Sequence, residues 1–82
     1  MFLNENVKIF SGTSNPSLTS AVCRHLGITI GGAKIDRFPD GEKWIKLEDD
    51  VRGRDCFVVQ STCEPVDEHL MELLIYLDCL RR

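Results

Sequence analysis

The sequence has no excess of positive charge and no long apolar run. Its 10 Lys and Arg residues are outnumbered by 13 Asp and Glu, which gives a net charge of −3. Nucleic-acid surfaces need clustered Lys and Arg, so we expect no nucleic-acid partner. No apolar run approaches the roughly 18–20 residues that a membrane span needs, and residues 1–6 lack the features of a signal peptide. We therefore expect one small cytoplasmic domain without a membrane partner.

Patterns for metal binding and disulfide formation are also lacking. No two cysteines form a C-x-x-C pair or a common zinc spacing, so we expect reduced thiols, three of which pack in apolar segments as small hydrophobes. Three adjacent acids at 48–50 would point in different directions and make a poor site for a divalent ion. The four cysteines are Cys23, Cys56, Cys63 and Cys79.

The first third of the chain predicts a strand, a loop of small residues and a helix. Residues 7–10 are rich in β-branched and aromatic side chains, and 11–14 contain turn formers. Asn15 and Pro16 suit the N-cap and first position of a helix that ends before Gly27. The loop at 11–15 presents N–H groups and hydroxyls at a helix N-terminus, where anions can bind, but ordinary capping is the interpretation that we favour.

A β-hairpin is predicted from two alternating segments, 33–37 and 43–47, around a tight turn. Pro39 suits the first central position of the turn, Asp40 suits the second, and Gly41 allows a positive φ. In the second arm Ile45 and Leu47 share one face. Trp44 lies on the other, where it covers a local edge or contacts another subunit.

The hairpin turn also carries groups that a turn does not require. Phe38 and Glu42 flank Pro39-Asp40-Gly41, which places a flat apolar ring beside two carboxylates. This combination suits a flat ring that bears an N–H₂ donor, such as adenine. The alternative is that Phe38 packs into the core while both acids are merely solvated.

The last part of the chain predicts a buried strand and a helix. Residues 56–60 are almost continuously apolar, which is typical of a parallel strand buried on both faces. Residues 67–82 contain no Gly or Pro, and their apolar stripes predict a helix buried on more than one side. The order strand–helix–β-hairpin–strand–helix indicates an α/β fold. The chain supplies too few elements to cover such a strand, so we expect self-association or a larger domain.

Five segments, taken in order, resemble the N-terminal part of the ribose-phosphate pyrophosphokinase family. The resemblance extends from about Val7 to Arg82 and implies that 1–82 is an incomplete N-terminal domain with a phosphoribosyltransferase-like α/β fold. The segments are Lys8-Ile9-Phe10-Ser11-Gly12-Thr13-Ser14, Arg37-Phe38-Pro39-Asp40-Gly41-Glu42, Val51-Arg52-Gly53-Arg54-Asp55, Val58-Val59-Gln60-Ser61 and Leu70-Met71-Glu72-Leu73-Leu74.

The resemblance implies a reaction and a role for the hairpin in it. The family transfers the diphosphoryl group of ATP to ribose 5-phosphate, requires Mg²⁺, and yields phosphoribosyl diphosphate and AMP. Its members assemble as hexamers or other homo-oligomers, in which the hairpin reaches a neighbouring subunit and recognises adenine. Phe38 would then contact the purine, Asp40 and Glu42 would accept hydrogen bonds from its amine and nearby donors, and Gly41 would permit the turn.

Other implied features are weaker or fall outside the chain. Arg52 matches an arginine of a regulatory phosphate or nucleotide site, but Asp50 stands where many members have serine and would repel phosphate. The family's catalytic residues, magnesium ligands and ribose 5-phosphate loop have no counterpart in 1–82. We therefore expect the chain to be inactive alone. The alternative is a non-catalytic interaction subunit like the synthetase-associated proteins.

Overall fold

The computed structural model describes residues 7–81 and forms a small α/β domain. The predicted order of strand, helix, hairpin, strand and helix is confirmed, with the last strand and the last helix each beginning one residue earlier than expected. Within residues 7–81, neither helix is long and apolar enough to cross a bilayer. The elements are β1 Val7–Ser11, α1 Pro16–Leu26, β2 Ala33–Arg37, β3 Lys43–Leu47, β4 Asp55–Val59 and α2 Val66–Arg81.

The strands form two separate pairs. β1 and β4 are parallel, with Val7 opposite Asp55 and Ser11 opposite Val59. β2 and β3 are antiparallel, with Ala33 opposite Leu47. A single bridge links β1 to the segment that leads into the hairpin. The parallel pairing of the last strand agrees with its almost continuous apolar sequence.

The boundaries of α1 follow from its capping residues. The side chain of Asn15 accepts a hydrogen bond from the N–H of Leu18 at 3.1 Å, and Pro16 occupies the first helical position. Gly27 ends the helix with φ 73°, in the left-handed region that glycine adopts without a steric cost. These three residues confirm the predicted start and end of the helix.

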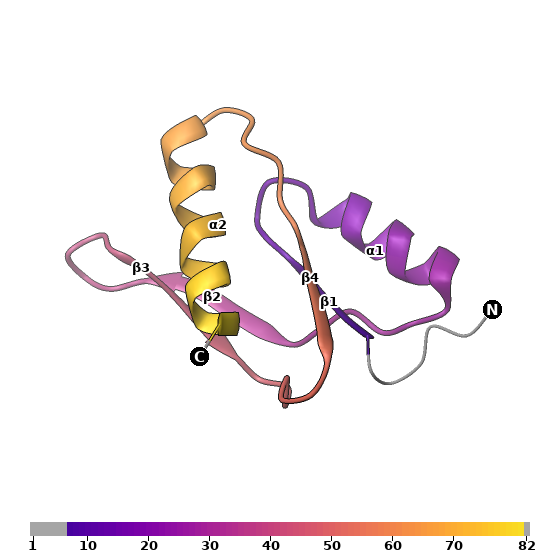
Figure 1. The fold of residues 1–82 in the computed structure, drawn as a ribbon. Coiled ribbons are helices and arrows are strands. Elements are labelled where there is room, and N and C mark those ends of the chain that lie inside the picture. The colour runs from indigo at the N-terminus through magenta and orange to yellow at the C-terminus, as the bar shows by residue number, and fades with distance from the viewer. Residues whose placement is uncertain (1–6, 82) are drawn as a thin grey trace.

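The two helices lie on either side of the β1–β4 pair, and the hairpin extends past α2 (Figure 1). α1 packs on β1, whereas α2 contacts both β4 and β3. Phe10 of β1 and Tyr76 of α2 are fully buried, with ring centroids 6.1 Å apart. The Tyr76 hydroxyl donates to the Ser11 carbonyl at 2.8 Å. This contact joins α2 to the end of β1.

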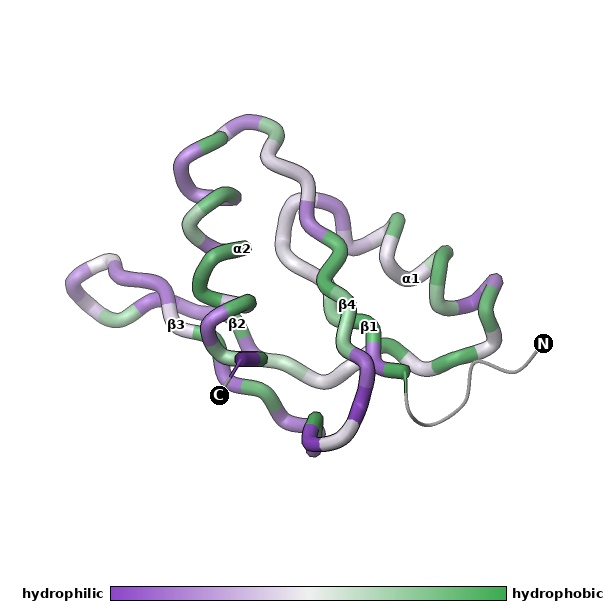
Figure 2. Tube along the Cα trace, viewed as in Figure 1, coloured by the Kyte–Doolittle hydropathy of each residue, from purple (hydrophilic) through white to green (hydrophobic). Residues whose placement is uncertain are grey.

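The apolar faces of α2 and β4 are less buried than the sequence predicts. Leu74 and Leu77 remain about half exposed, and Phe57 is 55% exposed, so within residues 7–81 neither element is covered on two sides. Apolar residues continue along α2 in Figure 2. The side chains of α2 that are fully buried are Glu72 and Tyr76. The inward face therefore contains polar groups, and most of the leucines lie elsewhere on the helix.

Candidate functional site at the hairpin

Backbone hydrogen bonds close the hairpin turn as the sequence predicts. The N–H of Gly41 donates to the Phe38 carbonyl at 2.8 Å, and the N–H of Phe38 donates to the Glu42 carbonyl at 2.7 Å. Gly41 has φ 95°, a conformation that side-chain-bearing residues rarely adopt. The Asp40 carboxylate accepts from the N–H of Glu42 at 3.1 Å. One Asp40 oxygen therefore stabilises the turn itself.

The predicted recognition groups lie on the surface of this turn. Phe38 is 51% exposed, so the alternative in which it packs into the core is wrong. Its ring centroid lies 6.2 Å from that of Trp44, with the planes tilted by 43°. Trp44 is partly buried and contacts this ring, and its two interpretations, as the cover of a local edge or as a contact with another subunit, stay predictions. Asp40 and Glu42 are also exposed, which leaves their carboxylates accessible to a ligand.

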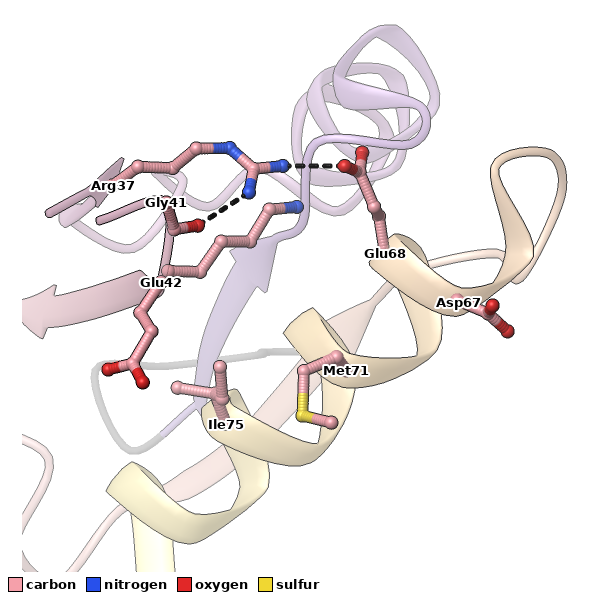
Figure 3. A pocket seen from close by; sticks show the side chains of 8 residues that line it. Arg37, Gly41, Glu42, Asp67, Glu68, Met71 and Ile75 are labelled. Carbon is pink, nitrogen blue, oxygen red and sulfur yellow. Dashed lines mark hydrogen bonds and ion pairs between the residues drawn. The ribbon is translucent and has the colours of Figure 1, made fainter. Parts of the chain in front are cut away.

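The end of the hairpin next to the turn is attached to α2 by two ion pairs. Arg37 and Lys43 face each other across the hairpin. Arg37 Nη2 lies 2.8 Å from Glu68 Oε1, and Lys43 Nζ lies 2.9 Å from Glu72 Oε1. Arg37 Nη1 also donates to the Gly41 carbonyl at 2.8 Å (Figure 3). We call Arg37, Lys43, Glu68 and Glu72 the hairpin clamp.

An open groove of about 470 Å³ lies between the hairpin and α2. Arg37, Lys43 and Glu68 of the clamp line it, and Met71 and Ile75 of α2 add apolar surface (Figure 3). The lining residues are Arg37, Gly41, Glu42, Lys43, Asp67, Glu68, Met71 and Ile75. The ring of Phe38 is not among them, but Gly41 and Glu42 are, so the groove adjoins the predicted adenine contact and shares these two residues with it.

Glu72 is a fully buried carboxylate surrounded by donors. Its Oε2 accepts from the N–H of Thr13 at 2.6 Å and from Gln60 Nε2 at 2.7 Å. Its Oε1 accepts from the Thr13 hydroxyl and from Lys43, each at 2.9 Å. Burial disfavours the charged form, but the hydrogen bonds from Thr13 and Lys43 outweigh it and hold the Glu72 pKa below its ordinary value. Glu72 is therefore an ionised internal anion.

The loop between β1 and α1 directs its polar groups to this internal anion and to Gln60. The N–H and hydroxyl of Ser14 donate to Gln60 Oε1 at 3.1 and 2.7 Å. The N–H of Ser61 donates to the Ser14 hydroxyl at 2.8 Å. Together with the Asn15 cap, these contacts support the structural interpretation that we favoured for residues 11–15, because the loop's N–H groups at Thr13 and Ser14 are already bound within the protein.

Arg52 lies away from the clamp, on the exposed loop before β4. Asp50 Oδ1 accepts from the Arg52 N–H at 3.1 Å and from its Nε at 3.3 Å. Hydrogen bonds from the backbone and side chain of Arg52 lower the Asp50 pKa, so the carboxylate is ionised at neutral pH. The guanidinium thus has an anionic neighbour, and its regulatory role stays a prediction.

Residues 7–81 offer no ligand set for the magnesium ion that the family resemblance implies. No three His, Cys, Asp or Glu side chains in this part of the chain gather closely enough to hold a metal ion. The four cysteines are all free thiols. We therefore assign no metal-dependent step to these residues.

Sequence reasoning missed the residues that hold the hairpin in place. Lys43 and Glu68 were assigned no role, and Glu72 and Gln60 were noted only within motifs. A signal was present: two cations face each other next to the hairpin turn, and Glu68 and Glu72 are spaced four residues apart on one helix face. This pattern can be recognised only once the hairpin is known to pack on α2.

The chain is similar to known ribose-phosphate pyrophosphokinases. The family profile described as the N-terminal domain of ribose phosphate pyrophosphokinase matches residues 7–82. The ribose-phosphate pyrophosphokinase of Fusobacterium nucleatum is 58% identical over 77 residues, which are 94% of this chain and 24% of that protein. The enzyme of Corynebacterium ammoniagenes is 48% identical over 81 residues, which are 99% of this chain and 26% of that protein.

A solved structure agrees with these sequence matches. The crystal structure of phosphoribosylpyrophosphate synthetase from Mycobacterium smegmatis superimposes with a TM-score of 0.89 at 35% identity. The superposition covers 95% of this chain and 26% of that one, so the chain spans about a quarter of the length of the relatives it matches. The order of helices and strands and the profile match point to the same family. The chain belongs to the ribose-phosphate pyrophosphokinase family, of which it represents the N-terminal domain.

Proposed function

We propose that this chain is an incomplete N-terminal domain of an enzyme that transfers the diphosphoryl group of ATP to ribose 5-phosphate. The products are phosphoribosyl diphosphate and AMP. Family membership supports the proposal, and so does the enzyme name of the Fusobacterium nucleatum relative, which is about four times as long as this chain. The ribose 5-phosphate site and the magnesium site belong to other parts of such a protein.

The contribution of this chain is adenine recognition by the hairpin tip. The observation that carries this proposal is the half-exposed ring of Phe38 beside two exposed carboxylates. An exposed aromatic ring offers a stacking face for a purine, and each stacked base contributes about 1–3 kcal/mol. The second oxygen of Asp40 and the carboxylate of Glu42 can accept from the exocyclic amine and nearby donors, while Gly41 permits the turn.

The geometry favours a nucleotide held mainly by another subunit. The hairpin extends past α2 (Figure 1), and its tip offers one stacking face and carboxylates but, in residues 38–42, no cationic side chain for the phosphates of ATP. The phosphates must therefore be bound elsewhere. A homo-oligomer, with a hexamer as the family expectation, supplies that second surface. Arg52 is a candidate for a separate regulatory phosphate or nucleotide site, and its pairing with Asp50 counts against that role.

The experiment uses a chimera in which this chain replaces the matching segment of the full-length Fusobacterium nucleatum relative. Phe38→Ala should raise the KM for ATP about tenfold or more and leave the KM for ribose 5-phosphate unchanged. Phe38→Tyr keeps a flat ring and should retain the affinity, whereas Phe38→Leu keeps apolar bulk and should lose it. An unchanged KM for ATP in folded, fully assembled Phe38→Ala chimera would reject adenine recognition by this ring.

A further inference from the structure

We propose that the hairpin clamp positions the nucleotide-binding tip, and that Arg37 and Glu68 act as positioning residues for ATP. The inference rests on the proposed function for its kinetic consequence. It does not require these side chains to touch the nucleotide. Arg37 and Lys43 are the last facing pair before the turn, so they control where residues 38–42 point.

The hairpin needs such a device because it is a two-stranded ribbon. Within residues 7–81, β2 and β3 pair only with each other. A two-stranded ribbon is weakly stable and twists easily unless another element packs on it. An anchor on one arm would still allow the ribbon to rotate about that arm. Anchors on two residues that lie opposite each other, one on each arm, prevent this rotation.

The clamp provides these two anchors from one face of one helix. Glu68 and Glu72 are four residues apart in α2, so both carboxylates point to the same side. Glu68 holds the arm that enters the turn, and Glu72 holds the arm that leaves it. Arg37 additionally reaches the Gly41 carbonyl at the tip. One guanidinium therefore links the helix, the end of β2 and the turn.

The inner half of the clamp extends this control to the body of the domain. Glu72 binds Lys43 and at the same time binds Thr13 and Gln60. The direction of the hairpin is thereby fixed relative to the β1–α1 loop and the end of β4. The outer pair of the clamp is Arg37 and Glu68, whose side chains are 44% and 51% exposed. Because the pair is exposed, it can be changed without disturbing the core. Loss of the outer pair should leave the fold intact and loosen only the tip.

The test compares Glu68→Gln with Asp67→Asn in the chimera. Both changes remove one negative charge from the first turn of α2 beside the groove, but only Glu68 is bonded to the hairpin. Glu68→Gln should raise the KM for ATP about threefold to fivefold, with kcat and the KM for ribose 5-phosphate unchanged. Asp67→Asn should leave all three values unchanged. The charge exchange Arg37→Glu with Glu68→Arg should recover part of the loss.

A second measurement separates the clamp from the proposed function. Amide hydrogen exchange of residues 38–42 should be about threefold faster in Glu68→Gln than in Asp67→Asn, whether or not ATP binds there. If Phe38→Ala raises the KM for ATP while Glu68→Gln and Asp67→Asn behave alike, the clamp is refuted and the proposed function stands. If Phe38→Ala has no effect, the proposed function fails, and equal exchange rates in the two α2 variants would still refute the clamp.

Discussion

Replacing Glu72 with glutamine should destabilise the domain more than this nearly isosteric change suggests. Both Glu72 oxygens face donors: Thr13 N–H and Gln60 Nε2 on one side, Lys43 Nζ and the Thr13 hydroxyl on the other. A glutamine side chain carries one oxygen and one NH₂ group. Whichever way it is oriented, its NH₂ group must face a donor.

Neighbouring groups cannot rearrange to remove this conflict. If the NH₂ group faces Lys43, the Thr13 hydroxyl can rotate to accept from it, but the ammonium cannot. If the NH₂ group faces the other side, Gln60 could flip its own amide, which would turn Nε2 toward the N–H of Ser14. The N–H of Thr13 would still face the NH₂ group of the new glutamine, which cannot accept from it. At least one buried donor is therefore left without an acceptor.

The expected cost is about 3 kcal/mol. Removing one partner of a buried ion pair costs about 3–5 kcal/mol, and an unsatisfied buried donor costs about 1–3 kcal/mol. The lower end applies because the Lys43 side chain keeps 12% exposure and can regain some water. Native proteins are stable by only about 5–15 kcal/mol, so a loss of this size should be easy to measure.

Urea unfolding of the chimera, followed by circular dichroism, measures this loss. Hydrogen exchange of residues 11–15 reports on the loop that Glu72 holds. Glu64→Gln is the matched control, because Glu64 carries the same chemical group in an exposed position. A midpoint shift for Glu72→Gln no larger than for Glu64→Gln, with unchanged exchange at 11–15, would refute the internal-anion reasoning.

The pH dependence gives an independent check on Glu72. Its pKa is below the ordinary value of 4.5 in the folded protein, so the folded state binds fewer protons than the unfolded state in this range. The stabilisation is present above the unfolded-state pKa and is lost as pH falls through the folded-state pKa. The Glu72→Gln variant should therefore lose less stability than the parent between about pH 5 and pH 3.

Two further substitutions test the same cluster. A methyl group added in Gly12→Ala would clash with the Gln60 side chain and come within 2.8 Å of Glu72 Oε2, so urea unfolding should show a loss of about 2 kcal/mol or more; a loss below 0.5 kcal/mol would contradict this packing. Tyr76→Phe should cost about 1 kcal/mol at neutral pH by removing the bond to Ser11. Burial and the Glu72 charge raise the Tyr76 pKa to about 12, so the parent should lose stability as pH rises from 10 towards 12. The Tyr76→Phe variant should lack that decline. If the parent and the variant lose stability equally between pH 10 and pH 12, Tyr76 is not the group responsible.

Local signals predicted the elements of this fold well. The Asn15 cap, Pro16 and Gly27 set the ends of α1, and the residues of the turn determine how the hairpin is closed. These features depend on neighbours within a few positions, which a sequence shows directly. The exposed position of Phe38 could not be decided in the same way. A ring beside a turn can face inward or outward with the same sequence, and here it packs partly on Trp44.

The orientation of α2 was beyond local reasoning because it depends on partners elsewhere in the chain. By apolar periodicity, the leucines should face inward and Glu72 should face water. The structure places Glu72 inside because Lys43, Gln60 and the loop at Thr13 together supply enough donors to keep its charge buried. The nearest of these donors in sequence is 12 residues away, and the most distant is 59 residues away.

The β1–α1 loop shows how such a cluster can be mistaken for a ligand site. The N–H of Thr13 faces an anion, as the start of a helix favours, but that anion is the carboxylate of Glu72, and the N–H of Ser14 is bound by Gln60 Oε1. The same carboxylate binds Lys43 next to the hairpin turn, so one buried charge sets both the loop and the direction of the hairpin. If tip and loop share this anchor, Glu72→Gln should speed hydrogen exchange at 38–42 and at 11–15 together. Faster exchange at 11–15 alone would show that the outer Arg37–Glu68 pair holds the tip without help from the interior.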